Sequence, residues 1–317
     1  MTQLIDPIEF TKVVTAMRSF FLSKGFVEVH TQNRLSILAA CEDPTTVATY
    51  NYAGEVWPLP QTGQMWLEYE LLKNPSTDGF FCISTSYRQE PNIIEGRHDL
   101  IFPMFEFEFP GTIDDLEAME RELIKHLGYD EEVDARDYKE WCESFGVKEL
   151  TYSHEEQMIG PSMIKNFPND TSPFWNMKQN GDGTAAKIDV ILGGMETIGS
   201  AERSSNPQEM KDMFCTISGG MYANLLFATF GKERVNKELD EFLSLDFDLG
   251  KHGDQIVGRV LSLFLHHLTE VGKEFGHGPG GGFDRGLSVV LEIGITRADD
   301  PVGPVKEEFP IRFRYAK

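Results

Sequence analysis

The sequence predicts an α+β fold in which helices flank an antiparallel β-sheet. Residues 80–86 and 104–109 have the composition of strands, and residues 90–100 between them contain the proline, asparagine and glycine of a loop. Two strands joined in this way form an antiparallel hairpin. The other strand candidates are separated by helical stretches of unequal length, which disfavours a doubly wound parallel sheet. At 317 residues the chain can bury a large core, and we expect residues 1–317 to form a single domain.

The first helix and the first strands are predicted from a helix-capping residue and from the alternation of apolar and polar residues. A helix is predicted to begin at Asp6-Pro7, where a capping residue precedes a proline at the first helical position, and to end at Gly25. Alternating apolar and polar residues at 26–31 then predict a strand. In the hairpin, the same alternation places Glu106 and Glu108 on one face of the second strand and three phenylalanines on the other.

The rest of the chain is predicted to contain helices and strands of unequal length. Residues 113–127 predict an amphipathic helix, and a capping box at Ser153-x-x-Glu156 predicts the start of a short one. Residues 187–192 predict a strand. Beyond it we expect a mostly helical insertion at about 205–272 and an apolar helix at 287–292.

Composition narrows the class of protein. The formal net charge is −22 and the pI is near 4.7, so the field of the chain repels polyanions at long range, although a local basic site can still bind ATP. The four cysteines show no Cys-x-x-Cys spacing, and we expect reduced, packed thiols. No apolar run is long enough to cross a bilayer, and the N-terminus does not resemble a secretion signal. We therefore expect a cytoplasmic protein.

One short stretch of the chain combines side chains that suit a nucleotide. Guanidinium groups bind phosphate oxygens in bidentate fashion, an aromatic ring stacks on a purine, and carboxylates hold magnesium or an amine. The stretch carries Arg88, Glu90, Arg97, His98, Phe102, Glu106 and Glu108.

A glycine-rich segment far along the chain complements that stretch. Gly278-x-Gly280-x-Gly282 directly precedes Phe283-Asp284-Arg285, and glycines let a backbone approach a ligand closely. Arg285 or Arg88 alone is more often a surface or salt-bridge arginine. Together with the glycines they indicate a nucleotide clamp. Because the glycines do not follow a βαβ pattern, a dinucleotide-binding fold is disfavoured.

These segments resemble the signature motifs of class II aminoacyl-tRNA synthetases. The stretch from Arg88 to Glu108 resembles the second motif, and residues 278–285 resemble the third. Residues 19–31 are similar to the first, with Gln32 where a proline normally follows. The resemblance sharpens toward the aspartyl and asparaginyl subgroup, in its asparaginyl form more than its aspartyl one. The segments that carry this are residues 59–68, Phe167-Pro168, Pro173-Phe174-Trp175, and the series Asp189, Glu196, Arg203.

The resemblance implies an α+β class II catalytic core and roles for individual residues. Arg88 and Arg285 would be catalytic. ATP would be bound by Arg88, Glu90, Arg97, His98, Phe102, Gly280, Gly282 and Arg285. The metal, Mg²⁺, would be held by Asp189 and Glu196, and the amino acid by Gln64, Glu106, Ser200 and Arg203.

The same comparison points to an altered substrate site. Leu67 stands where aspartyl enzymes place a lysine for the substrate side chain. The run Ser200-Ala201-Glu202-Arg203 replaces the usual Gly-Ser-Gln-Arg, which adds a negative charge close to the site. We expect the adenylation machinery to be intact and the acid that is recognised to differ.

The resemblance also suggests an overall function. The first motif begins too near the start of the sequence for the N-terminal anticodon-binding barrel of this subgroup, so we expect a bare catalytic domain. The main hypothesis is an ATP-dependent, AMP-forming ligase that adenylates aspartate or a related amino acid and transfers the acyl group to ammonia or a small amine, as an asparagine synthetase does. In this hypothesis tRNA is not a partner. A stand-alone synthetase that charges tRNA or a protein is the alternative, and a non-catalytic ligand-binding regulator is a third. The first motif implies a homodimer.

Overall fold

The computed structural model describes residues 5–32, 34–41, 43–91, 99–171, 174–245, 247, 255–261, 288–289 and 311–312. The chain divides into two compact units, Met1–Leu265 and His266–Lys317. In the second unit, Ser288–Val289 (β11) pairs in antiparallel fashion with Ile311–Arg312 (β12). We expected a helix at 287–292, and β11 corrects that prediction at Ser288 and Val289, while the other residues of the range lie outside the described ones. A short apolar run does not distinguish helix from strand by its periodicity.

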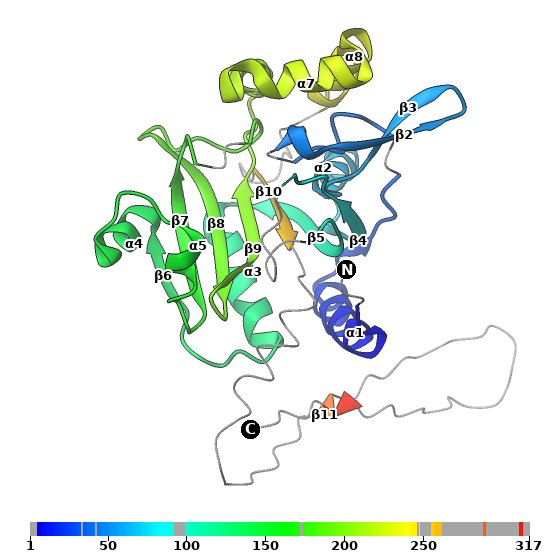
Figure 1. The fold of residues 1–317 in the computed structure, drawn as a ribbon. Coiled ribbons are helices and arrows are strands. Elements are labelled where there is room, and N and C mark those ends of the chain that lie inside the picture. The colour runs from blue at the N-terminus through cyan, green and yellow to red at the C-terminus, as the bar shows by residue number, and fades with distance from the viewer. Residues whose placement is uncertain are drawn as a thin grey trace, which may run out of the picture. The chain divides into compact units, whose positions relative to one another are not determined.

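The first unit is built on a mixed sheet, in which the described residues form eight strands in the order β1-β4-β5-β10-β9-β8-β7-β6 (Figure 1). Its two outermost pairs, β1·β4 and β6·β7, are parallel, and the other neighbours are antiparallel. The α+β class with a largely antiparallel sheet is therefore confirmed. The strands are Val27–Glu28 (β1), Phe80–Tyr87 (β4), Ile101–Gly111 (β5), Asp134–Asp137 (β6), Ser162–Pro168 (β7), Thr184–Leu192 (β8), Met195–Glu202 (β9) and Gln255–Leu261 (β10).

The predicted hairpin is β4 and β5, paired from Phe80↔Glu108 to Tyr87↔Ile101. The phenylalanines of β5 face helix α1 (Pro7–Ser23), where the ring of Phe21 lies 5.3 Å from that of Phe105 and 4.5 Å from that of Phe107. Glu106 and Glu108 consequently occupy the opposite face of the sheet.

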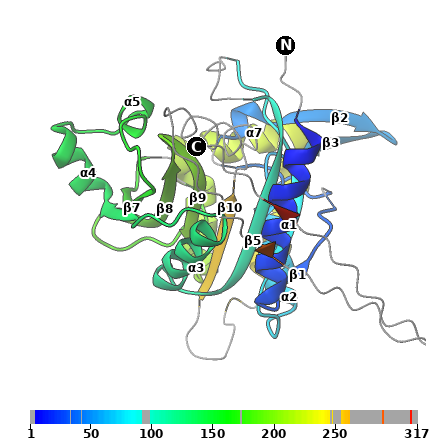
Figure 2. The ribbon, with the colours of Figure 1, turned by 90° about the horizontal axis from the view of Figure 1, so that it is seen from below.

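Two helices cover the phenylalanine face (Figure 2). Helix α1 begins as predicted, since the Asp6 side chain accepts hydrogen bonds from the backbone N–H groups of Ile8 and Glu9. Helix α3 (Ile113–His126) contacts β5, β8 and β9. The face that carries the two glutamates is thus left for the helices that follow.

Helix α2 (Gln64–Lys73) contacts β4, β5 and β10 on that opposite face. A large core extends from it to the later helices, with Trp175 at its centre against the rings of Phe214 and Phe242. The remaining elements are Pro44–Thr46 (η1), Ala48–Tyr52 (β2), Glu55–Leu59 (β3), Tyr138–Phe145 (α4), Tyr152–Glu155 (α5), Pro207–Thr216 (α6), Ile217–Gly220 (η2), Met221–Phe230 (α7) and Lys232–Leu243 (α8).

Two local predictions need correction. Among the described residues of the 205–272 region, the last helix ends at Leu243, and β10 is a strand that lies between β5 and β9 in the sheet. The β-branched residues of β10 favour a strand once neighbours on both sides complete its hydrogen bonds. Helix α5 is capped by Thr151, which forms a capping box with His154. The predicted pair, Ser153 and Glu156, lies two residues further along the chain.

One helical stretch among the described residues, Pro207–Phe230, is long and apolar enough by length and composition to cross a membrane. It is interrupted at Ser218 and Gly219, whose backbone dihedral angles are not helical. Its side chains Phe214 and Leu226 belong to the hydrophobic core.

Candidate active site

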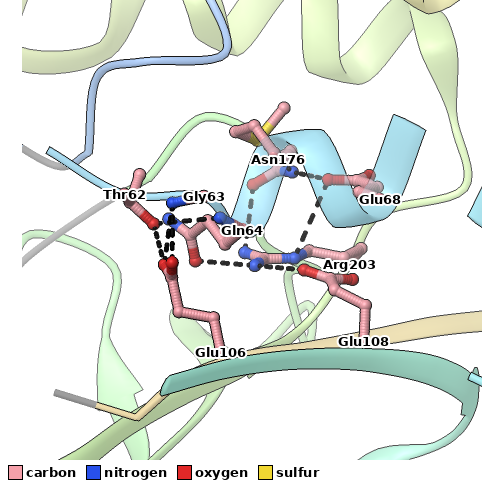
Figure 3. A network of polar contacts seen from close by, with 9 residues as sticks. Thr62, Gly63, Gln64, Glu68, Glu106, Glu108, Asn176 and Arg203 are labelled. Carbon is pink, nitrogen blue, oxygen red and sulfur yellow. Dashed lines mark hydrogen bonds and ion pairs between the residues drawn. The ribbon is translucent and has the colours of Figure 1, made fainter. Parts of the chain in front are cut away.

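Glu106 of β5 is fully buried at the start of helix α2 (Figure 3). Its carboxylate accepts hydrogen bonds from the Gly63 N–H at 2.8 and 2.9 Å, from Thr62 Oγ1 at 2.5 Å and from Ser84 Oγ at 2.6 Å. Burial raises the pKa of Glu106, and these hydrogen bonds oppose that rise. Glu106 therefore holds the segment that precedes Gln64.

Gly63 is required at this place by close contacts. A Cβ atom there would lie 2.8 Å from Glu106 Oε2 and 2.9 Å from Thr31 Cγ2. Both distances are too short for a side chain to fit without movement. The segment thus lies tightly against β5, and the first turn of α2 presents Gln64 toward Arg203 (Figure 3).

Arg203 is the centre of a buried polar cluster, which we call the Arg203 network (Figure 3). The guanidinium is almost fully enclosed, with 2% of the residue exposed. Its Nη2 donates to Gln64 Oε1 at 2.8 Å and to Glu108 Oε1 at 3.0 Å. Its Nη1 donates to Asn176 Oδ1 at 3.3 Å, and Nε lies 3.9 Å from Glu68 Oε2. Two carboxyl groups and two amides thus surround one guanidinium.

Glu68 is unusual within this network. Its pKa is raised from the ordinary value of 4.5 to about 8, mainly because of burial and in part because of the nearby charge of Glu108, while Arg203 and a hydrogen bond from Asn176 oppose the rise. Among the described residues, Glu68 Oε1 has no hydrogen-bond partner although it is buried. Near neutral pH this carboxyl group is mostly protonated and can donate or accept a hydrogen bond.

The two predicted metal ligands lie on one face of the sheet. Asp189 of β8 is directly opposite Gly199 of β9, and Glu196 is opposite Ile191. Glu196 is three residues from Gly199 and would face the other way in a regular strand. A β-bulge opposite Val190 and Ile191 restores it to the face of Asp189.

The geometry of this carboxylate pair, Asp189 and Glu196, fits Mg²⁺. A Cβ atom at Gly199 would lie 2.7 Å from Glu196 Oε1 and 3.5 Å from Asp189 Oδ1, so both oxygens approach the same space above the glycine. Within the described part of the chain, no three His, Cys, Asp or Glu side chains gather as a metal site. Mg²⁺ is typically held by one or two carboxylates together with substrate phosphates and water, and the pair matches that donor set.

Small residues separate the carboxylate pair from the Arg203 network. Across the sheet, Ala201 of β9 is opposite Gly258 of β10, which is opposite Glu108 of β5. Gly199 lies beside Ala201 on the same face of β9. Between the carboxylate pair and Arg203, this face of β9 therefore carries only the small residues Gly199 and Ala201.

Arg88 and Phe102 lie together at the end of the β4–β5 hairpin. The Arg88 Cζ atom is 5.5 Å from the centre of the Phe102 ring, and the Arg88 backbone N–H donates to Leu100 O at 2.9 Å. Glu90 follows in the same described segment. Arg97, His98, Gly280, Gly282 and Arg285 lie outside the described residues, so their predicted contacts with ATP stay predictions.

Two residues of the run Ser200-Ala201-Glu202-Arg203 point away from the Arg203 network. Ser200 lies on the other face of β9 by alternation, and its hydroxyl donates to Ile188 O at 2.8 Å. Glu202 is on that face too. Its carboxylate lies 2.8 Å from Lys178 Nζ and accepts a hydrogen bond from the Ile113 N–H at the start of α3. The charge of Glu202 is thus compensated there.

Three members of the Arg203 network were not among the substrate-binding residues expected from the sequence: Glu68, Glu108 and Asn176. For Glu68 a signal existed, because it lies four residues after Gln64 on the same helix and so shares its face. Asn176 comes from a loop 108 positions further along the chain than Glu68, and no local pattern identifies it.

The sequence matches a family model and is similar to curated proteins. Residues 8–253 match the family model described as tRNA synthetases class II (D, K and N). An asparagine–tRNA ligase of Desulforamulus reducens is 26% identical, over 62% of this chain and 54% of the relative. An asparagine–tRNA ligase of Aliivibrio fischeri is 36% identical, over 26% of this chain and 17% of the relative. The chain therefore spans about half or less of these curated relatives.

Solved structures show the same fold. The asparaginyl-tRNA synthetase of Pyrococcus horikoshii, complexed with asparaginyl-adenylate, superposes with a TM-score of 0.65 at 18% identity, over 83% of this chain and 64% of that one. The corresponding enzyme of Entamoeba histolytica, also with asparaginyl-adenylate, gives a TM-score of 0.59 at 16% identity, over 84% and 63%. At this level of identity the likeness concerns the fold.

Proposed function

The chain belongs to the class II tRNA synthetase family (D, K and N), and we propose that it forms the adenylate of an amino acid with a short carboxylate or carboxamide side chain. The observation that carries the proposal is the Arg203 network. Burial of a guanidinium and two carboxyl groups has a large desolvation cost. Binding of a polar ligand is a function that accounts for keeping these groups in the interior. Asn176 and Gln64 hold the guanidinium in place.

The side chains of the network suit aspartate or asparagine. When Glu68 is protonated, its O–H and the Arg203 guanidinium can both donate to a substrate carboxylate. When Glu68 is ionised, it can accept an N–H of a carboxamide while Arg203 donates to the amide oxygen. The site is thus complementary to the side-chain carboxylate of aspartate and to the side-chain carboxamide of asparagine. Protonated Glu68 favours aspartate, and ionised Glu68 favours asparagine.

The remaining described residues would serve ATP. Arg88 would stabilise the charge that develops at the α-phosphorus when the substrate carboxylate attacks and pyrophosphate leaves. The ring of Phe102, which lies under Arg88, offers a surface for the adenine. Asp189 and Glu196 would hold Mg²⁺, which supplies charge neutralisation on the phosphate oxygens when bound.

For the acceptor, we propose ammonia or a small amine. The nitrogen would attack the carbonyl carbon of the adenylate and AMP would leave with the bonding electron pair. Attack on a β-adenylate of aspartate gives asparagine, whereas attack on an α-adenylate gives isoasparagine. The net charge of −22 supports a small acceptor over a polyanion.

Charging of tRNA is the second candidate, because the relatives found in both comparisons are named as asparagine–tRNA ligases or asparaginyl-tRNA synthetases. The comparisons do not support our expectation that tRNA is not a partner. If tRNA is the acceptor, the attacking group is a ribose hydroxyl and the product is an ester.

The test is a product assay with ATP, Mg²⁺ and either aspartate or asparagine, in parallel with ammonium, with bulk tRNA, and with neither. Chromatography with mass detection separates AMP, asparagine and isoasparagine, and acid precipitation measures charged tRNA. We expect aspartate and ammonium together to yield an amide and AMP. Charged tRNA without any amide would overturn the choice of acceptor, and AMP formation that ignores the amino acid would overturn the adenylation proposal.

A further inference from the structure

A lysine accompanies the carboxylate pair. Lys187 lies two residues before Asp189 on β8, so both side chains share one face of the strand. The residue is 5% exposed. Its Nζ atom lies 3.0 Å from Asp189 Oδ2 and 4.3 Å from the centre of the Phe167 ring. The ammonium group is thus held between a carboxylate and an aromatic face.

The lysine and the space above Gly199 involve different oxygens of Asp189. Oδ2 faces Lys187, whereas Oδ1 lies 3.5 Å from the position that a Gly199 Cβ would take. That same position is 2.7 Å from Glu196 Oε1. The carboxylate pair therefore presents one oxygen from each residue to a shared space while a resident cation lies on the far oxygen of Asp189.

The Lys187 ammonium group weakens the attraction of the carboxylate pair for a second cation. A positive charge within 4–6 Å lowers the proton affinity of a carboxylate by roughly tenfold to a thousandfold, and the same repulsion opposes a divalent ion. The ammonium group lies 3.0 Å from the Asp189 carboxylate of the pair, and the residue opposite Lys187 on β9 is the small Ala201. Burial keeps the repulsion from being screened by solvent.

We propose that Lys187 is a resident counter-cation that lowers the affinity of Asp189 and Glu196 for free divalent ions. The pair then takes up its metal when a polyphosphate brings further negative charge and further oxygen ligands. Lys187 is a positioning residue in this proposal, since it acts on the metal through Asp189. The proposal rests on the proposed function only where it names the polyphosphate.

The test measures Mn²⁺ binding to the nucleotide-free full chain by the electron paramagnetic resonance signal of the free ion. We expect Lys187→Met to bind Mn²⁺ about tenfold more tightly than the unaltered protein. Lys187→Arg, which keeps the charge, should bind like the unaltered protein. Adding Asp189→Asn to Lys187→Met should abolish the gain.

Lys178→Met is the matched control, because Lys178 pairs with Glu202 on the other face of β9 and should leave Mn²⁺ binding unchanged. Lys187→Gln is a second neutral variant in case the methionine is not accommodated, and circular dichroism verifies folding. Equal Mn²⁺ affinities of the neutral variants and the unaltered protein would overturn the proposal. Because no ATP is present, that result would leave adenylate formation to be judged by its own assay.

Discussion

Glu68 links the chemistry of the site to pH. Its pKa in the folded chain is about 8, well above the ordinary 4.5, so the folded state binds this proton more tightly than the unfolded one. The resulting stabilisation is fully present below pH 4.5 and is lost as the pH rises through about 8. Both the stability and the choice of substrate should therefore change over this window.

We predict that Glu68→Gln, which is neutral at every pH, removes this dependence. The free energy of unfolding, measured by urea titration, should decrease in the unaltered protein as the pH rises from 4.5 to about 8, and it should decrease less in the variant. Glu70→Gln on the same helix is the control, because Glu70 is half-buried and lies outside the Arg203 network. A parallel fall in the unaltered protein and in both variants would contradict the account of Glu68.

At the scale of residues, the sequence identified the central arginine but few of its partners. Arg203 and Gln64 were predicted as substrate-binding residues, and the structure brings them within 2.8 Å of each other. Ser200 was predicted with them, yet one step along a strand reverses the direction of a side chain. Such a detail depends on the register of β9, which the sequence does not reveal.

Among the elements, helix α8 secures the segment that leads into η1 and β2. Glu238 Oε2 accepts hydrogen bonds from the backbone N–H groups of Ser36, at 2.7 Å, and Ile37, at 3.3 Å, and from the Ser36 hydroxyl. Its other oxygen lies 2.9 Å from Arg234 Nε. A single buried carboxylate thus joins helix α8 to a loop some 200 positions earlier.

We predict that Glu238→Ala destabilises the fold by about 3 kcal/mol, because it leaves buried N–H donors unsatisfied and Arg234 without its carboxylate. Glu241→Ala on the same helix removes only an exposed carboxylate 3.8 Å from Lys237 and should change the free energy of unfolding by less than about 0.5 kcal/mol. Urea denaturation measures both. Equal effects of the two substitutions would show that α8 is not anchored through Glu238.

Elements with strong local signals were predicted well. The Asp6 cap fixed the start of α1, and alternation with an intervening loop fixed the β4–β5 hairpin. Strand β10 was missed because its partners β5 and β9 lie far away in the chain, and only pairing with both makes a strand the better conformation. The bulge in β9 that turns Glu196 toward Asp189 has no local signature either.

For the whole molecule, the family and the fold class followed from motifs distributed along most of the chain. The family model matches residues 8–253, and the solved relatives share the fold. The acceptor of the reaction does not follow in the same way. It depends on surfaces around the site and on overall charge, for which −22 favours a small molecule and the tRNA ligase relatives favour tRNA.

The central claim, that this chain forms an amino-acid adenylate, is tested most directly by exchange of labelled pyrophosphate into ATP in the presence of each standard amino acid. We predict exchange that requires aspartate or asparagine. Arg203→Lys, which keeps the charge but loses the planar fork, should reduce it by about 100-fold, while Arg121→Lys on α3 should leave it unchanged. The account is contradicted if no amino acid supports exchange, or if Arg203→Lys exchanges as fast as the unaltered protein.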